Sequence, residues 1–168
     1  MIERVHWIRK IERLWEKTPI VWLSGVRRVG KTSIAKQLSK ALYLNCDLPS
    51  TRQALKSPES FLRSVRDKTL LLDEVHRLDE PSEVLKIAAD EFPGLKVLAT
   101  GSSTLAATRK FRDSLTGRKR NLHLLPVLAS ELGGFGIADV KDRLLRGGLP
   151  QNLLAEKSDP DLLAEWLD

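Results

Sequence analysis

Residues 24–33 read Ser-Gly-Val-Arg-Arg-Val-Gly-Lys-Thr-Ser and follow directly on the apolar run Ile-Val-Trp-Leu at 20–23. The spacing Gly-x-x-x-x-Gly-Lys-Thr is the Walker A pattern, in which a loop between a strand and a helix turns successive backbone N–H groups toward a polyphosphate. Gly25 and Gly30 serve that turn, because glycine adopts backbone dihedrals that a Cβ would forbid. The alternative, a chance glycine-rich turn, is disfavoured because a strand and a helix flank the loop where phosphate binding needs them.

Each side chain of this loop has an expected role in binding ATP and Mg²⁺. Lys31 is expected to reach the β- and γ-phosphates, and Thr32 to offer its hydroxyl to Mg²⁺. The helix that starts near Lys31 presents its positive dipole end to the same phosphates. Arg28 is a candidate contact for nucleotide oxygens or a neighbouring subunit, although loop arginines are commonly solvated. The predicted nucleotide-binding residues are Gly25, Arg28, Val29, Gly30, Lys31, Thr32 and Ser33.

A second motif is the short apolar strand Thr-Leu-Leu-Leu-Asp-Glu at 69–74, which ends in two carboxylates as a Walker B strand does. Asp73 is predicted to hold Mg²⁺ through a water, together with Thr32. Glu74 is predicted to orient or deprotonate the water that attacks the γ-phosphate. The alternative for Glu74 is a solvated carboxylate or an ion pair with His76 or Arg77.

Apolar spacing predicts a helix over 2–17 and then alternating strands and helices. We expect strands at 20–24, 42–46, 69–73 and 96–103, helices at 32–42 and 81–92, and short helical turns from Pro49 and Pro58. This alternation favours an α/β fold with a parallel sheet covered on both faces. Ligands bind beyond the carboxyl ends of such strands, so one crevice should gather Gly25, Asp73, Glu74, Thr100 and Ser102.

Three hydroxyls close the fourth strand, at Thr100, Ser102 and Ser103. Any of them is a candidate for sensing the γ-phosphate or placing the attacking water, and we favour Ser102 as the catalytic one. The alternative is turn or N-cap duty for the helix that follows.

The length of 168 residues favours one domain, and a net charge of +6 favours anionic partners. The basic stretch 109–120 has three interpretations: an arginine finger in trans, a surface on a nucleic-acid backbone, or a solvated face. The N-terminus lacks a continuous apolar segment, so we expect a cytoplasmic protein with no membrane contact. The scattered histidines form no zinc-site spacing, and Mg²⁺ is the only metal we expect.

Further motifs extend the pattern, and together they resemble the prokaryotic ATP-binding proteins that pair an AAA-type ATPase domain with a separate C-terminal domain. The stretches that carry the resemblance are 25–32, 71–76, Thr100-Gly101-Ser102-Ser103, Gly117-Arg118 and Gly147-Gly148-Leu149-Pro150. The chain departs from that family at 126–132, where Leu-Ser-Phe usually follows the proline, and at Gln151, where an acid is common.

The resemblance implies an additional-strand P-loop NTPase with a five-stranded parallel sheet, in which the acidic strand lies next to the phosphate-loop strand. It implies a nucleotide-binding core over 1–127 and a small helical lid over 128–168, cut short before a further C-terminal domain. Arg118 matches a catalytic basic residue near the nucleotide or an adjacent subunit.

These observations favour an Mg²⁺-dependent ATPase that uses hydrolysis to drive a conformational change in a protein partner or a homo-oligomer. The alternative is a nucleotide-gated DNA-binding module with little or no hydrolysis, in which 109–120 lies on the phosphate backbone and affinity falls steeply with salt. A small-molecule kinase is a third interpretation, disfavoured because paired acids suit water activation better than transfer to a bound metabolite.

Overall fold

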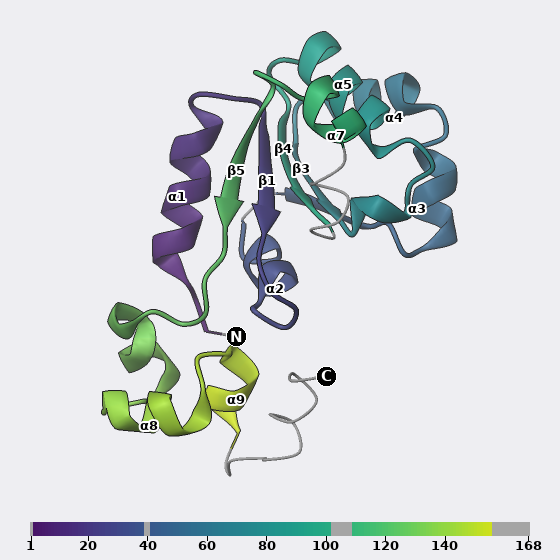
Figure 1. The fold of residues 1–168 in the computed structure, drawn as a ribbon. Helices are drawn as coiled ribbons and strands as arrows, with labels where there is room; N and C mark the ends of the chain where they lie inside the picture. The colour runs from purple at the N-terminus through teal and green to yellow at the C-terminus, as the bar shows by residue number, and fades with distance from the viewer. Residues whose placement is uncertain (1, 39–40, 102–108, 156–168) are drawn as a thin grey trace.

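A parallel five-stranded sheet forms the centre of the computed structural model, which describes residues 2–38, 41–101 and 109–155 (Figure 1). The strands lie in the order β2-β3-β4-β1-β5, and every neighbouring pair is parallel. The predicted parallel sheet is therefore confirmed. The strand bounds are β1 Ile20–Ser24, β2 Ala41–Asn45, β3 Thr69–Asp73, β4 Lys96–Thr100 and β5 Lys119–His123.

The position of the acidic strand corrects one expectation. β3 does not lie next to the phosphate-loop strand β1, because β4 lies between them and pairs Leu98 with Val21 on one side and with Leu71 on the other. The apolar pattern could not decide between the two strands, because the central residues of β3 and of β4 are equally buried and both strands are interior to a covered parallel sheet. The other edge of β1 pairs with β5.

Helices cover both faces of the sheet, as expected (Figure 1). Successive strand residues point to opposite faces, so each strand contributes to two clusters of buried side chains. Val21 and Leu71 pack with Trp7 of α1, whereas Trp22 and Leu72 face the other layer. One layer contains α1 Val5–Trp15 and α2 Lys31–Ala35; the other contains α3 Pro49–Ala54, α4 Pro58–Ser64, α5 Pro81–Glu91 and α7 Arg109–Ser114.

Several elements differ from the predicted ranges, and the largest differences are at α2 and β5. The helix predicted over 32–42 is shorter, since α2 ends at Ala35 and β2 already begins at Ala41. No strand was predicted at 119–123, because four of the five residues of β5 are polar or charged and only Leu122 is buried. Such a composition is tolerated at a sheet edge, where one side faces solvent. Pro49 and Pro58 do begin helices, as predicted.

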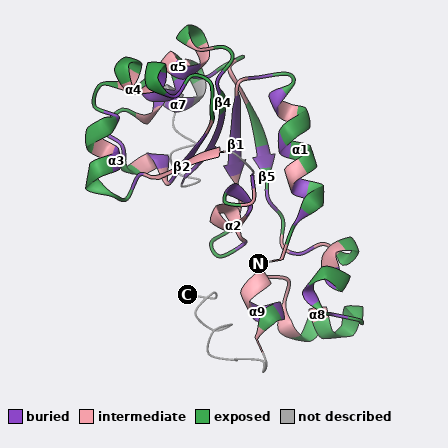
Figure 2. Ribbon diagram, turned by 180° about the vertical axis from the view of Figure 1, so that it is seen from behind, coloured by how far each residue is buried: buried purple, intermediate pink, exposed green. Residues whose placement is uncertain are grey.

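A helical unit at 129–155 lies beyond the carboxyl ends of β1 and β5 (Figure 1). It consists of the 3-10 helix η2 Ala129–Phe135, α8 Val140–Arg146 and α9 Pro150–Leu154. Its own small apolar cluster is built around Leu132, Phe135 and Leu153. Much of α8 is exposed (Figure 2). Within the three described ranges, no helix is long and apolar enough to cross a bilayer.

Candidate active site

The phosphate loop, residues 25–30, connects the carboxyl end of β1 to the first residue of α2. The ammonium group of Lys31 donates hydrogen bonds to the backbone oxygens of Gly25, at 2.9 Å, and Val26, at 3.1 Å. Burial lowers the pKa of Lys31, whereas the nearby carboxylates of Glu74 and Asp73 act to raise it. The lysine thus lies over the loop, within the field of both strand-tip acids.

Both glycines of the loop occupy positions that disfavour a side chain. At Gly25, φ is +150° and an added Cβ would lie 2.7 Å from the backbone oxygen of Leu124, directly after β5. At Gly30, φ is +100°, in the range that L side chains rarely adopt. A Cβ there would also lie 3.7 Å from Cγ of Pro150, so the start of α9 lies against the loop.

Asp73 is 4% exposed and accepts hydrogen bonds from three hydroxyl groups on three different elements. Thr32 of α2 donates to Oδ2 at 2.7 Å, and Tyr43 of β2 donates to the same oxygen at 2.8 Å. Thr100 of β4 donates to Oδ1. The carboxylate is therefore fixed in orientation, with the hydroxyl oxygen of Thr32 beside it. Burial raises the pKa of Tyr43, and its bond to Asp73 raises it further.

Glu74 follows Asp73 at the tip of β3. Its backbone N–H donates to Oγ1 of Thr100 at 3.1 Å, and its carboxylate lies 3.2 Å from Nδ1 of His76. Of the two ion-pair partners considered from the sequence, His76 is the one in contact, since Arg77 pairs with Asp47 at 2.9 Å. The Glu74 side chain is 34% exposed, so water reaches it.

Backbone strain occurs at this site. Across the described ranges, Arg28 and Glu74 are the two non-glycine residues with left-handed backbone, at φ +63° and +57°. Such conformations persist where the surrounding structure imposes them, and they cluster at functional sites. One lies in the phosphate loop and the other at the acidic strand tip, which supports treating the two as one site.

Arg4 is a buried residue that precedes α1 and hydrogen-bonds to the phosphate loop. Its guanidinium donates to the backbone oxygen of Val29 at 3.2 Å and to both carboxylate oxygens of Glu131, at 2.9 and 2.7 Å. It also donates to the backbone oxygens of Leu125, at 3.2 Å, and Pro126, at 3.4 Å. Arg4 thereby joins the phosphate loop to the first turn of the helical unit.

Comparison with known proteins agrees with this geometry: residues 17–133, more than half of the chain, match a protein family described as AAA domain. The chain belongs to the AAA domain family. Along its whole length it is also 26% identical to an uncharacterised protein of Mycobacterium tuberculosis, of which it spans 38%. The family prediction made from the motifs is confirmed.

Solved structures show the same fold for this AAA domain. The Walker-type ATPase of Pyrococcus abyssi superposes with a TM-score of 0.66 at 19% identity, over 92% of this chain and 66% of that one. A signal transduction ATPase with numerous domains and a tetratricopeptide repeat sensor, from Pyrococcus horikoshii, gives 0.61 at 16% identity, over 99% and 32%. The fold is that of an AAA-type P-loop NTPase, as predicted.

The AAA domain brings most of the predicted site residues together. Lys31, Thr32, Asp73, Glu74 and Thr100 form one connected cluster at the carboxyl ends of β1, β3 and β4. Ser33 lies in the first turn of α2, half-buried. Ser102 and Ser103, the other hydroxyls considered for the fourth strand, lie outside the described residues.

Arg118 lies at the other end of the sheet from the phosphate loop of its own chain. It immediately precedes β5, whose first residue pairs with Ile20 at the amino end of β1. Its guanidinium forms two hydrogen bonds with Asp90, at 2.6 and 3.0 Å. The AAA domain therefore does not bring Arg118 to its own nucleotide site, and a role across subunits stays a prediction.

Part of the basic stretch 109–120 is buried and is not accessible to a nucleic acid. Phe111, the only aromatic residue within it, is 1% exposed and packs edge-on against Trp22 with ring centroids 4.9 Å apart. It is therefore a core residue and presents no face for stacking on a base. Burial also lowers the pKa of Lys119. DNA binding through this stretch stays a prediction.

Two residues at the site had no signal in the sequence: Tyr43, which binds Asp73, and Arg4, which binds Val29. Each makes its contact across a long sequence separation, so neither belongs to a local motif.

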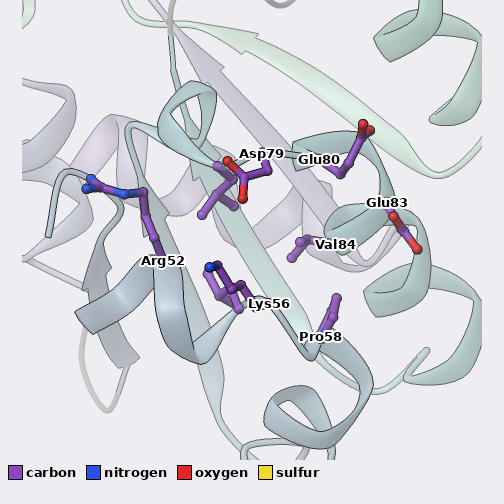
Figure 3. A pocket seen from close by; sticks show the side chains of 9 residues that line it. Arg52, Lys56, Pro58, Asp79, Glu80, Glu83 and Val84 are labelled. Atoms are coloured by element: carbon purple, nitrogen blue, oxygen red, sulfur yellow. The ribbon is translucent and has the colours of Figure 1, made fainter. Parts of the chain in front are cut away.

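A cavity of about 180 Å³ lies apart from the site, between α3 and α5 (Figure 3). Arg52, Lys56 and Glu83 are among the residues that line it, and none of the predicted nucleotide-binding residues does.

Proposed function

We propose that this AAA domain binds ATP with Mg²⁺ and hydrolyses the bond between the β- and γ-phosphates. The observation that carries the proposal is the contact between the two motifs, in which Thr32 of the phosphate loop donates to Asp73 of the acidic strand at 2.7 Å. Lys31 and Glu74 lie close enough to this pair to interact electrostatically. Walker A and Walker B residues thus form one site.

The oxygen donors fit Mg²⁺, which prefers hard oxygen ligands and commonly binds through one or two carboxylates, waters and substrate phosphates. Thr32 and Asp73 would hold it, Asp73 through a water. Bound there, Mg²⁺ would neutralise charge on the phosphate oxygens. The ammonium group of Lys31 supplies a second positive charge for those oxygens.

Glu74 is the proposed general base. It accepts a proton from water as the water oxygen bonds to the γ-phosphorus, and the bond to the β–γ bridging oxygen breaks, giving ADP and inorganic phosphate. The contact with His76 is the alternative role for Glu74; what supports the role of base is the position of the carboxylate at the strand tip, close enough to Lys31 to interact with it electrostatically. Water reaches this carboxylate, whereas Asp73 is buried.

The proposal extends to the use of the hydrolysis. Pro150 of the helical unit lies beside Gly30 of the phosphate loop, and Arg4 hydrogen-bonds both to the loop and to Glu131 of the unit. A conformational change of the loop should therefore be transmitted to the unit. We propose that hydrolysis in this way drives a conformational change in a protein partner or in a second copy of the chain. A cytoplasmic location, where ATP is available, belongs to the same proposal.

Phosphate release and ATP binding by calorimetry test the function on wild type, Lys31→Ala and Glu74→Gln. We expect Lys31→Ala to lose binding, and Glu74→Gln to bind ATP while releasing little phosphate. Matched controls are Lys96→Ala, an exposed lysine at the amino end of β4, and Glu91→Gln, an exposed acid at the end of α5. Equal phosphate release by all five proteins would refute the enzymatic proposal.

A further inference from the structure

Tyr43 is the only tyrosine of the chain, and its hydroxyl donates to Oδ2 of Asp73 at 2.8 Å. That same oxygen accepts the hydroxyl of Thr32 at 2.7 Å. One carboxylate oxygen therefore accepts a hydrogen bond from Thr32 of α2 and another from Tyr43 of β2, the strand beside β3. Position 43 lies in neither nucleotide-binding motif.

The strand register explains how Tyr43 reaches the acid. Tyr43 pairs with Leu71, and Asn45 is the residue opposite Asp73. Tyr43 and Asp73 lie on the same face of neighbouring strands, offset by two residues, or about 7 Å along the strand. A long aromatic side chain spans this diagonal. The ammonium group of Lys36, the residue that follows α2, lies 4.9 Å from the ring centroid of Tyr43 and packs against the ring.

We propose that Tyr43 is a positioning residue that orients the Asp73 carboxylate for Mg²⁺; this rests on the proposed function. Carboxylates that bind metals are themselves oriented by outer hydrogen bonds, and removing such a partner typically lowers metal affinity by about 10–100-fold. Mg²⁺ is demanding in this respect, because it requires near-ideal octahedral geometry. Binding of the phosphates by Lys31 does not use the Tyr43 hydroxyl, so the two contributions are separable.

The variant Tyr43→Phe removes one oxygen atom and keeps the ring. Calorimetry on the full chain measures ATP affinity in excess chelator, and then the Mg²⁺ concentration that gives half of the metal-dependent increase in affinity. We expect unchanged ATP affinity in chelator and a half-saturating Mg²⁺ concentration about tenfold higher, at the lower end of the range for outer partners.

A matched control is Thr18→Val, which also removes one hydroxyl hydrogen bond, at 2.6 Å to the backbone oxygen of Arg118 at the opposite edge of the sheet. We expect it to lower the unfolding free energy as Tyr43→Phe does, but to leave the Mg²⁺ requirement unchanged. If both variants shift it equally, the effect is one of general stability and the proposal is overturned.

Because Tyr43 is unique in the chain, 3-fluorotyrosine gives a single ¹⁹F resonance that reports on this position alone. Mn²⁺, which favours the same oxygen ligands as Mg²⁺, should broaden that resonance strongly in the presence of ATP. A wild-type Mg²⁺ requirement in Tyr43→Phe overturns this inference alone. An unbroadened resonance in a protein that binds ATP would show that the metal does not lie beside Asp73, and it overturns the proposed metal site together with this inference. A wild type that binds no ATP, with or without Mg²⁺, overturns the proposed function and this inference together.

Discussion

Thr100 forms hydrogen bonds with both strand-tip acids. Its hydroxyl donates to Oδ1 of Asp73 and accepts the backbone N–H of Glu74. Thr100→Val keeps the shape and removes both bonds in a position that is 1% exposed. We expect the unfolding free energy to fall by about 1–3 kcal/mol, because buried polar groups lose a partner. Phosphate release should fall more than ATP affinity, since Lys31 still binds the phosphates.

A parallel variant, Ser102→Ala, separates Thr100 from Ser102, two of the three hydroxyls considered for this strand. Phosphate release that falls in Thr100→Val and not in Ser102→Ala would assign the role to Thr100. The opposite result would support the sequence-based prediction for Ser102. Urea denaturation of both variants shows whether a loss of phosphate release is caused by a lower unfolding free energy.

At the scale of residues, a contact could be predicted when its two partners lie close together in the sequence. The proposed roles of Lys31 and Thr32 follow from a local pattern, because the residues of a phosphate-binding loop are continuous in sequence. Tyr43 was not predicted, since its partner Asp73 lies 30 positions away and the contact requires β2 to pair with β3. Arg4 lies 127 positions from its partner Glu131 and looked like one more charge on an amphipathic segment.

At the scale of elements, the ion pair of Arg4 and Glu131 joins the start of α1 to η2, with the two side chains 3% and 9% exposed. Arg4→Met removes the cation and leaves a buried carboxylate without its main partner. We expect the unfolding free energy to fall by about 3–5 kcal/mol, the usual cost of breaking a buried pair from one side. Urea denaturation measures it.

The control for this prediction is Arg9→Met, an exposed arginine within α1, for which we expect a change of about 0.5 kcal/mol or less. A second variant, Arg4→Met combined with Glu131→Leu, should recover part of the loss, because it removes the stranded charge. An Arg4→Met protein as stable as Arg9→Met would show that this pair does not hold the two elements together.

The same pair predicts a pH dependence. Burial alone would raise the pKa of Glu131, but hydrogen bonds from Arg4, the backbone N–H of Leu128 and Trp7, together with the charge of Arg4, lower it below its ordinary value of 4.5. The folded state therefore binds fewer protons than the unfolded state. The stabilisation is full above pH 4.5 and is lost as the pH falls through the folded-state pKa.

In Arg4→Met the pKa of Glu131 should be higher than in wild type, since burial remains while the hydrogen bond and the charge of Arg4, which both lower it, are lost. Acid should neutralise the stranded carboxylate and stabilise the variant relative to wild type. The difference in unfolding free energy between the two proteins should therefore shrink as pH is lowered from 7 toward 4, because all other titrating groups are common to both. Urea denaturation across this pH series checks it; a constant difference would contradict it.

Among the elements, the buried strands were predictable and the order of strands was not. β3 is a continuous apolar run, the pattern of a covered parallel strand. Nothing in that run shows which strand lies beside it, because β4, which does pair with β1, is buried to the same extent. β5 was missed because an edge strand can be polar, and its first two residues, Lys119 and Arg120, were interpreted as part of the basic stretch 109–120.

At the scale of the whole molecule, the sheet separates two groups of charges. The phosphate loop and the acids lie at the carboxyl ends of the strands, whereas Arg118 and Asp90 lie at the amino end of β5 and the carboxyl end of α5. A five-residue strand is about 16 Å long, which is farther than an arginine side chain reaches. Within one chain, Arg118→Ala should therefore leave ATP affinity unchanged and phosphate release proportional to protein concentration.

Arg118 can act on a nucleotide only from another subunit, and a mixing experiment decides this. If it does act there, wild type should show specific activity that rises with protein concentration, and Arg118→Ala should not. Adding Lys31→Ala chains, which keep Arg118 but bind no ATP, should then restore the rise, since their arginine serves the intact site of the Arg118→Ala chain. Specific activity that is independent of concentration in both proteins would leave the ion pair with Asp90 as the role of Arg118, because the two residues bind each other within one chain.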